Sequence, residues 1–261
     1  MDYSPTGGGT YGGDWTHLND VEELPDGRYV ASLRNQDQVV FIDPQQGLLE
    51  EWTLGTDDNH EVLYEQHNPD YIPRERGGPA VLVADSENNR VVEYQRVNGR
   101  WKQTWAWTND NVRWPRDADR LSNNNTLITV SNGNRVIEVD QSGEVVWKVA
   151  VNTPYEAERI HTGDESHSGN SARAANLQSP GTKKDTVSRE SSSLGTVSRF
   201  KYEVRSIVPN ILINGLLFVL PIWIGFEEFI FLVVLLCASM VWVATELYWR
   251  GYRLRVPVQH R

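Results

Sequence analysis

An internal repeat constrains the fold of this chain more than any other feature of its sequence. Residues 20–43 (DVEELPDGRYVASLRNQDQVVFID) align without a gap with residues 117–140 (DADRLSNNNTLITVSNGNRVIEVD), at an offset of 97. A middle copy, residues 81–94, aligns with residues 126–139 at an offset of 45. The period is therefore about 45–52 residues. Such a period is typical of proteins that stack copies of one supersecondary unit.

Each copy predicts four short antiparallel strands. A turn such as Pro25-Asp26-Gly27 comes before a β-rich second strand, an Asn/Gly turn follows it, and a third strand alternates apolar and polar residues. The predicted second strands are residues 29–33, 81–84 and 127–130, and the predicted third strands are residues 39–42, 91–94 and 136–139. The fourth strands carry Trp52, Trp101 or Trp105, and Trp147. Four such strands at this period indicate a β-propeller blade, and the alternative is a flat β-meander or sandwich.

Three copies fit between Asp14 and about Ile160, so the predicted fold class is an all-β partial propeller of about three four-stranded blades. A closed propeller typically has four to eight blades. Half a ring would expose two sheet edges, which favour aggregation. We therefore expect that blades upstream of Met1, or a second chain, complete the propeller.

The C-terminal part predicts a membrane anchor. Residues 207–226 and 229–249 are almost wholly apolar, and about 20 apolar residues suffice for a helix to cross a bilayer. Glu227 and Glu228 separate them and predict a tight turn. We therefore expect a two-helix transmembrane hairpin in which Asn210 and Asn214 bond to the neighbouring helix. The predicted organisation is a polar segment (1–13), the partial propeller (14–161), a disordered linker (162–204), and the hairpin with a basic tail (205–261).

The charge balance excludes some partners. The formal net charge is −10, and no basic patch is available to neutralise nucleic-acid phosphates. The acidic composition favours a halophilic source, and the alternative is an ordinary acidic protein. Basic residues flank both ends of the predicted hairpin and place both in the cytoplasm. Cys237 is the one cysteine, so no disulfide can form within the chain.

Polar residues of the predicted first strands point to one site. In a propeller these strands line the central channel, and here they span residues 14–23, 64–72 and 114–121. Convergence would bring His17, Asn19, His67 and Arg116 to one funnel, and Arg34 could reach the same mouth.

Imidazole can act as nucleophile or general acid/base, and Arg and Asn can hold anionic oxygens. The set suits group transfer from an anionic ester, although each histidine could instead be structural. Two histidines without a nearby acidic ligand give little support for a metal site, so we expect no metal and no cofactor.

At these residues the sequence resembles a known family. The stretches DWTHLNDV, VASLRNQDQVVFID and EQHNPDYI are similar to the later blades of the arylsulfate sulfotransferases, in their haloarchaeal branch, over about residues 12–165. The resemblance implies a six-bladed propeller that transfers a sulfuryl group from an aryl sulfate to a phenol, through a sulfated histidine and without a nucleotide donor. It also implies an extracellular domain, in conflict with the charge-based orientation.

Motif by motif, the resemblance implies a role for four residues. The Gln-His motif makes His67 the nucleophile, the Asp-Trp-x-His-x-Asn motif makes His17 and Asn19 sulfate-binding or acid/base residues, and the Ser-x-Arg motif makes Arg34 an oxyanion ligand. Asn35 departs from the histidine that is usual in bacterial members, and the earlier blades are missing, so the chain could be inactive. The alternatives are a non-catalytic, membrane-tethered binding or scaffold module and, with less support, a quinone-binding propeller.

Overall fold

The structure is a computed structural model, which describes residues 14–109, 112–160, 168–179, 208–220, 224 and 226–250. The chain divides into two compact units, Met1–Asn214 and Gly215–Arg261. The predicted polar segment, residues 1–13, lies outside the described residues.

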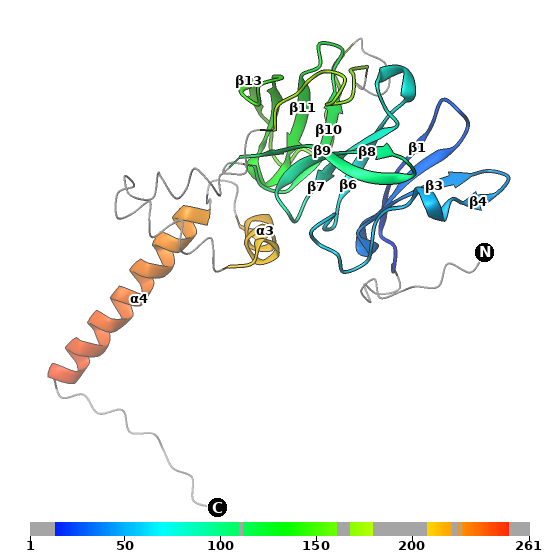
Figure 1. Cartoon of the computed structure of the whole chain (residues 1–261). Helices are drawn as coiled ribbons and strands as arrows, with labels where there is room; N and C mark the ends of the chain where they lie inside the picture. The colour runs from blue at the N-terminus through cyan, green and yellow to red at the C-terminus, as the bar shows by residue number, and fades with distance from the viewer. Residues whose placement is uncertain are drawn as a thin grey trace, which may run out of the picture. The chain divides into compact units, whose positions relative to one another are not determined.

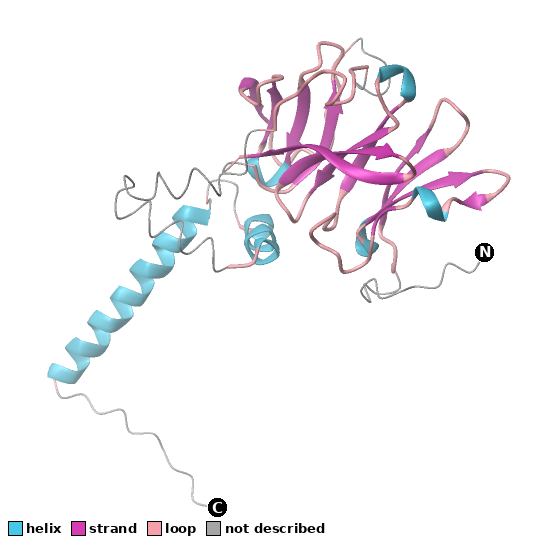
Figure 2. Cartoon of the chain, in the orientation of Figure 1, coloured by secondary structure: helices cyan, strands magenta, loops and turns pink. Residues whose placement is uncertain are grey.

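Three antiparallel sheets follow one another along the first unit, in chain order (Figures 1 and 2). The second and third sheets have four strands each, as the repeat predicts. The second sheet consists of β6 (His67–Ile72), β7 (Ala80–Asp85), β8 (Arg90–Val97) and β9 (Arg100–Thr108). The third consists of β10 (Pro115–Arg120), β11 (Thr126–Val130), β12 (Arg135–Val139) and β13 (Val145–Ala150).

The first sheet differs from the other two in its outer part. Two strands of only two residues both pair with β3, at opposite ends of it, where the other sheets have one long fourth strand. The sheet consists of β1 (Leu18–Glu23), β2 (Tyr29–Leu33), β3 (Gln38–Asp43), β4 (Gly47–Leu48) and β5 (Leu54–Gly55). Short 3-10 turns connect strands: η1 (Arg34–Gln36), η2 (Glu50–Trp52), η3 (Arg74–Arg76) and η4 (Ser131–Gly133).

The turn after each second strand has the same backbone conformation. Asp37, Asn89 and Asn134 occupy equivalent positions there, with φ values of 52°, 53° and 51°. Asn and Asp adopt this left-handed conformation more easily than other side chains except Gly. The predicted Asn/Gly turns are therefore confirmed, and the predicted second and third strands lie within the observed ones.

The core lies between the sheets. Alternate residues of a strand point to opposite faces. In β7 both faces are buried: Val81 and Val83 contact the first sheet's side of the core, whereas Ala80 and Leu82 contact the third sheet's side. The middle sheet is therefore apolar on both faces. Trp105 and Trp107, from β9, are the largest buried side chains of the interface between the second and third sheets.

The first strands of the three sheets lie side by side: β1 contacts β6, and β6 contacts β10. Each of them has an irregular register near its beginning, opposite the end of the second strand. Such bulges redirect side chains, and they occur where the predicted site residues lie.

Residues 168–179 correct part of the linker prediction. They lie inside the predicted disordered linker but pack across the second and third sheets, with Ser171 and Ala172 buried. The Ala172 N–H donates to the Glu93 carboxylate, the Gly169 N–H to the Arg120 carbonyl, and the Trp105 indole to the Gln178 carbonyl. The rest of the predicted linker lies outside the described residues.

The described residues of the C-terminal part contain one long apolar helix, not two. The helix α4 (Phe226–Trp249) includes Glu227 and Glu228, so the predicted turn at these residues is wrong. Within it, Glu228–Trp249 is long and apolar enough to cross a membrane, with a mean hydropathy of 2.3. The other helix, α3 (Asn210–Val219), has only 10 residues and is too short to span.

Proline accounts for the short length of α3. Pro221 stands two residues after Val219 in the sequence, and a residue before proline disfavours helical geometry. Among the described residues, the expected hydrogen bond from Asn214 to a neighbouring helix is not formed. Its side chain donates to Glu87 at 2.9 Å, and its carbonyl accepts from Asn132 at 3.1 Å.

Candidate active site

His67 lies at the start of β6 and is almost fully buried, with 1% of its surface exposed. Its Nδ1 lies 3.1 Å from the Glu65 carbonyl and 2.8 Å from the Ser86 hydroxyl. Ser86 in turn donates to the Pro115 carbonyl at 2.7 Å. The imidazole is thus held at the interface of the second and third sheets by contacts to both.

These contacts determine the tautomer of His67. A carbonyl oxygen only accepts, and the Ser86 hydrogen is directed to Pro115, so Nδ1 must carry the proton. The lone pair is then on Nε2, which has no hydrogen-bond partner among the described residues. A neutral imidazole with its Nε2 lone pair available can act as a nucleophile.

The surroundings keep His67 neutral. Burial, and then the positive charges of Arg116 and Arg34, lower the pKa of His67 well below its ordinary value of 6.5. The backbone contact with Glu65 and the charge of His17 act more weakly, in opposite directions. The arginines and His17 are therefore close enough to act on His67, as the convergence of the first strands predicts.

Arg34 lies at this site, but its charge is already paired. Its Nη2 donates to the Glu65 carboxylate, and its Nη1 lies 3.3 Å from the Asn35 side-chain oxygen. The side chains of Arg34 and Glu65 are only 15% and 10% exposed. An anion that binds to Arg34 would therefore compete with Glu65.

The residues of the Asp-Trp-x-His-x-Asn motif, His17 and Asn19 among them, lie on the side of the first sheet. The Nδ1 of His17 lies 2.7 Å from the Asp14 carboxylate, and the His17 side chain is 45% exposed. Asn19 donates to the Gln66 carbonyl at 2.9 Å, next to His67. His17, Asn19, Arg34, His67 and Arg116 are therefore gathered at one place, while their chemical roles remain predictions.

Two aromatic rings flank His67. Trp114 and Tyr155 contact its imidazole nearly at right angles, with centroid distances of 6.4 and 6.1 Å. The Arg116 guanidinium lies over both rings, 4.0 Å from the Trp114 centroid and 4.9 Å from that of Tyr155. Tyr155, which sequence reasoning missed, therefore belongs to the site.

The repeat explains where these side chains lie. The backbone contact from Asn35 N–H to the Thr16 carbonyl recurs from Glu87 to Tyr64 and from Asn132 to Arg113. The residue three positions after each carbonyl acceptor is a predicted site residue. These equivalent residues on the first strands of the three sheets are Asn19, His67 and Arg116.

A fourth repeat begins after the third sheet. Residues 153–160 (TPYEAERI), here called the fourth-repeat segment, align without a gap with residues 114–121 (WPRDADRL). Thr153 N–H donates to the Asn134 side chain at 3.0 Å as Trp114 N–H donates to Asn89 at 2.8 Å. In this alignment Tyr155 takes the position of Arg116. The gapless match between the two segments is the sequence signal that could have identified Tyr155 as a site residue.

Two further contacts repeat. Ser131 donates to the Pro154 carbonyl at 2.6 Å, as Ser86 does to that of Pro115. Arg159 pairs with Glu138 as Arg120 pairs with Glu93. The fourth-repeat segment is thus docked on the third sheet as a first strand would be, although it is drawn as loop in Figure 2.

A small acidic cavity of about 30 Å³ lies further along the first strands. Burial raises the pKa of Asp70 to about 7 and that of Asp20 to about 6, and it raises the pKa of Asp117 well above its ordinary value. No group of three or more His, Cys, Asp or Glu residues is placed to hold a metal ion in the part of the chain that the structure describes.

Residues 9–152 match the sequence model of the family Arylsulfotransferase (ASST). The chain belongs to the arylsulfotransferase family. The predicted membership is thus confirmed, whereas the haloarchaeal branch stays a prediction. The match to the family model ends at residue 152, directly before the fourth-repeat segment.

Among solved structures, this arylsulfotransferase-family chain is similar to a catalytically inactive virginiamycin B lyase from Staphylococcus aureus (12% identity, TM-score 0.39). It is also similar to the periplasmic gluconolactonase PpgL from Pseudomonas aeruginosa (18%, 0.40) and to hydrazine synthase from Kuenenia stuttgartiensis (14%, 0.39). Each match covers 54% of this chain and 43%, 42% and 40% of the other chain, respectively. The chain thus spans less than half the length of these structures. A search of curated proteins gives no match.

Proposed function

We propose that this chain is a membrane-anchored arylsulfotransferase-like protein that transfers a sulfuryl group from an aryl sulfate to a phenol through His67. The observation that carries the proposal is the state of His67: a buried, neutral imidazole with Nδ1 as donor and the Nε2 lone pair available. A nucleophile of this kind needs no external base.

In the proposed reaction, Nε2 attacks sulfur and the bond from sulfur to the phenolic oxygen of the donor breaks. The phenol leaves with a proton, for which His17 is the proposed source because Asp14 orients its ring. An acceptor phenol then gives up its proton to His17, which restores the imidazolium, and attacks the sulfur. The N–S bond breaks, and His67 regains its lone pair. Asn19, Arg34 and Arg116 are the proposed ligands of the sulfuryl oxygens.

The proposed architecture is a partial β-propeller whose ring is completed by another chain or by further blades. The repeated inter-sheet contacts and the three consecutive sheets support it. The anchor is the span Glu228–Trp249 in α4. On which side of the membrane the sheets lie is a separate test, by protease protection in sealed vesicles.

The experiment uses the full chain in detergent with 4-nitrophenyl sulfate and phenol. We expect release of 4-nitrophenol that depends on phenol, with formation of phenyl sulfate detected by mass. His67→Ala should abolish transfer. His60→Ala is the matched control and should keep activity within about twofold, because His60 is a half-exposed residue stacked on Tyr64.

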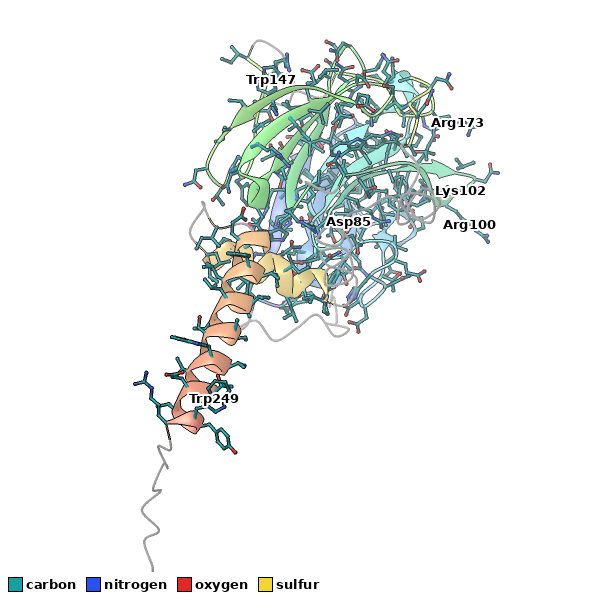
Figure 3. All side chains as sticks on the ribbon, turned by 90° about the vertical axis from the view of Figure 1, so that its left-hand side faces the viewer. Asp85, Arg100, Lys102, Trp147, Arg173 and Trp249 are labelled. Carbon is teal, nitrogen blue, oxygen red and sulfur yellow. The ribbon has the colours of Figure 1, made fainter. Side chains whose placement is uncertain are left out.

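The alternative is a non-catalytic, membrane-tethered scaffold. It is favoured by the outer face of the third sheet, where Trp147 and Val149 are 46% and 40% exposed. Trp147 is labelled in Figure 3. Exposed apolar surface of this kind marks interaction sites. If the unaltered chain transfers no sulfuryl group, or if His67→Ala transfers as well as the unaltered chain, the enzymatic proposal fails and the scaffold is retained.

A further inference from the structure

Arg116 differs from three other arginines of the first unit in how its charge is accommodated. Arg34, Arg90 and Arg120 each form an ion pair with a carboxylate. Arg116 has no carboxylate within ion-pair distance among the described residues, and its Nε is buried without a hydrogen-bond partner there. Burial lowers the pKa of Arg116, but an arginine still remains protonated at neutral pH.

Aromatic faces take the place of the carboxylate. The guanidinium lies 4.0 Å from the centroid of Trp114 and 4.9 Å from that of Tyr155, both within the range of a cation–π contact. Two π faces stabilise a cation without bringing a negative charge, so they do not compete with an incoming anion. A carboxylate does compete, as Glu65 does at Arg34.

The backbone fixes Tyr155 independently of Arg116. The residue before it, Pro154, accepts a hydrogen bond from Ser131, and the N–H of Thr153 is bound by Asn134. Four residues further on, Arg159 pairs with Glu138. Tyr155 is therefore presented by a docked strand position and not by a free loop.

We propose that Tyr155 is a positioning residue of the site, which together with Trp114 holds the Arg116 guanidinium toward His67 as the main ligand for an oxyanion. The inference rests on the proposed function in that the oxyanion is a sulfuryl group. The family resemblance implies Arg34 as the oxyanion ligand, whereas this proposal makes Arg116 the main ligand. Tyr155 lies outside the residues that the family model matches.

The test measures equilibrium binding of inorganic sulfate and, separately, of phenol to the full chain in detergent, so that no turnover is required. Tyr155→Leu removes the ring and should weaken sulfate binding about tenfold, within the range of a desolvated cation–π contact. Tyr155→Phe keeps the ring and should weaken it less than about threefold. Neither change should alter phenol binding, because Tyr155 acts through the cation.

Trp147→Leu is the matched control. It removes a similarly exposed ring, 46% against 43%, from over another arginine, Arg159, at 5.9 Å. We expect it to leave sulfate binding unchanged. Arg116→Ala should weaken sulfate binding at least as much as Tyr155→Leu, and the double variant should show no further loss, which is the signature of coupled residues. Thermal unfolding confirms that each variant is folded.

The inference is overturned if the unaltered chain does not bind sulfate, if folded Tyr155→Leu binds it normally, or if phenol binding falls equally. The last result would mean that the ring contacts the substrate directly. Failure of the proposed function looks different: sulfate binding would depend on Tyr155 and Arg116 while no sulfuryl transfer occurred. Conversely, transfer with sulfate binding insensitive to Tyr155 would remove only this inference.

Discussion

The interface between the second and third sheets and the interface between the third sheet and the fourth-repeat segment contain the same polar contacts. A serine hydroxyl donates to a proline carbonyl, an asparagine side chain accepts a backbone N–H, and an arginine pairs with a glutamate. An arginine also lies over a tryptophan in each, Arg120 over Trp105 and Arg159 over Trp147.

The two interfaces differ in burial. Trp105 is 2% exposed and Trp147 is 46% exposed, although both lie opposite the glutamate of their repeat in the strand register. The side chains of Arg120 and Arg159 are 0% and 43% exposed. The polar contacts therefore position a first strand, whereas burial of the neighbouring face requires the strands that follow it. This comparison predicts that equivalent substitutions have unequal effects.

The largest effect is expected for the two tryptophans. Trp105→Ala should lower the free energy of unfolding by about 4 kcal/mol, because it leaves a cavity in the core. Trp147→Ala should lower it by less than about 1 kcal/mol, because water already reaches the ring. Urea unfolding followed by circular dichroism measures both. Equal losses would mean that the outer face of the third sheet is covered in the folded protein.

The next effect, which reaches about the same size at its maximum, concerns the pH dependence of stability. Asp70 is buried on β6, with its pKa raised to about 7 from 3.8, whereas Glu158 of the fourth-repeat segment is exposed. The folded state holds the Asp70 proton more tightly than the unfolded state does. The contribution of this carboxyl to the free energy of unfolding is therefore fully present below pH 4 and is lost as the pH rises to about 7. At about 1.4 kcal/mol per pKa unit, the loss is up to about 4 kcal/mol.

Asp70→Asn should therefore flatten the decline in the free energy of unfolding between pH 4 and 7, while Glu158→Gln should shift the whole curve by less than about 0.5 kcal/mol. Chemical unfolding at several pH values compares the two. A variant Asp70→Asn with an unchanged pH profile would show that this carboxyl is hydrated in the folded state.

The ion pairs come next. Arg120→Gln should cost about 3 kcal/mol, because it leaves Glu93 buried without its counter-charge. In the other pair Arg159 is 43% exposed while Glu138 is buried. Arg159→Gln should cost less than about 1 kcal/mol, because Glu138 keeps its hydrogen bonds from Asn123 and Asn125. Raising the salt concentration during unfolding provides the control, since salt screens exposed pairs more than buried ones. A large cost for Arg159→Gln would show that this pair is shielded from solvent.

The smallest effect on stability is expected for Trp147→Lys, within about 0.5 kcal/mol. Its informative readout is self-association, because a lysine on an exposed edge strand disfavours pairing between chains. Sedimentation in detergent should show less association than for the unaltered chain. Lys148→Arg, on the same strand, keeps the charge and should leave association unchanged.

Much of the fold could be predicted because each sheet repeats the same sequence pattern. The second strand predicted at residues 29–33 is the observed β2, and the five predicted site residues do converge. Two properties of the site could not be predicted. The pairing of Arg34 with Glu65 joins side chains 31 positions apart through the packing of two sheets. The inclusion of Tyr155 depends on a repeat of which only the first strand is present.

The second predicted span fails for a local reason. An apolar window reports composition, but it does not report where the backbone can remain helical. Pro221 interrupts the first apolar segment, and the helix α3 ends at Val219. The second segment has no proline between residues 229 and 249 and forms a continuous helix.

Residues 168–179 also have a mechanical consequence. They stand in the chain between Tyr155 and α4, and they are hydrogen-bonded to the second sheet through Glu93 and to the third through Arg120. Tension applied through the C-terminal helix would reach this stretch before it reached the fourth-repeat segment. If α4 is the proposed anchor, a pull on it would have to detach these residues from two sheets before it could displace Tyr155 from Arg116, and the site would be insulated from that force.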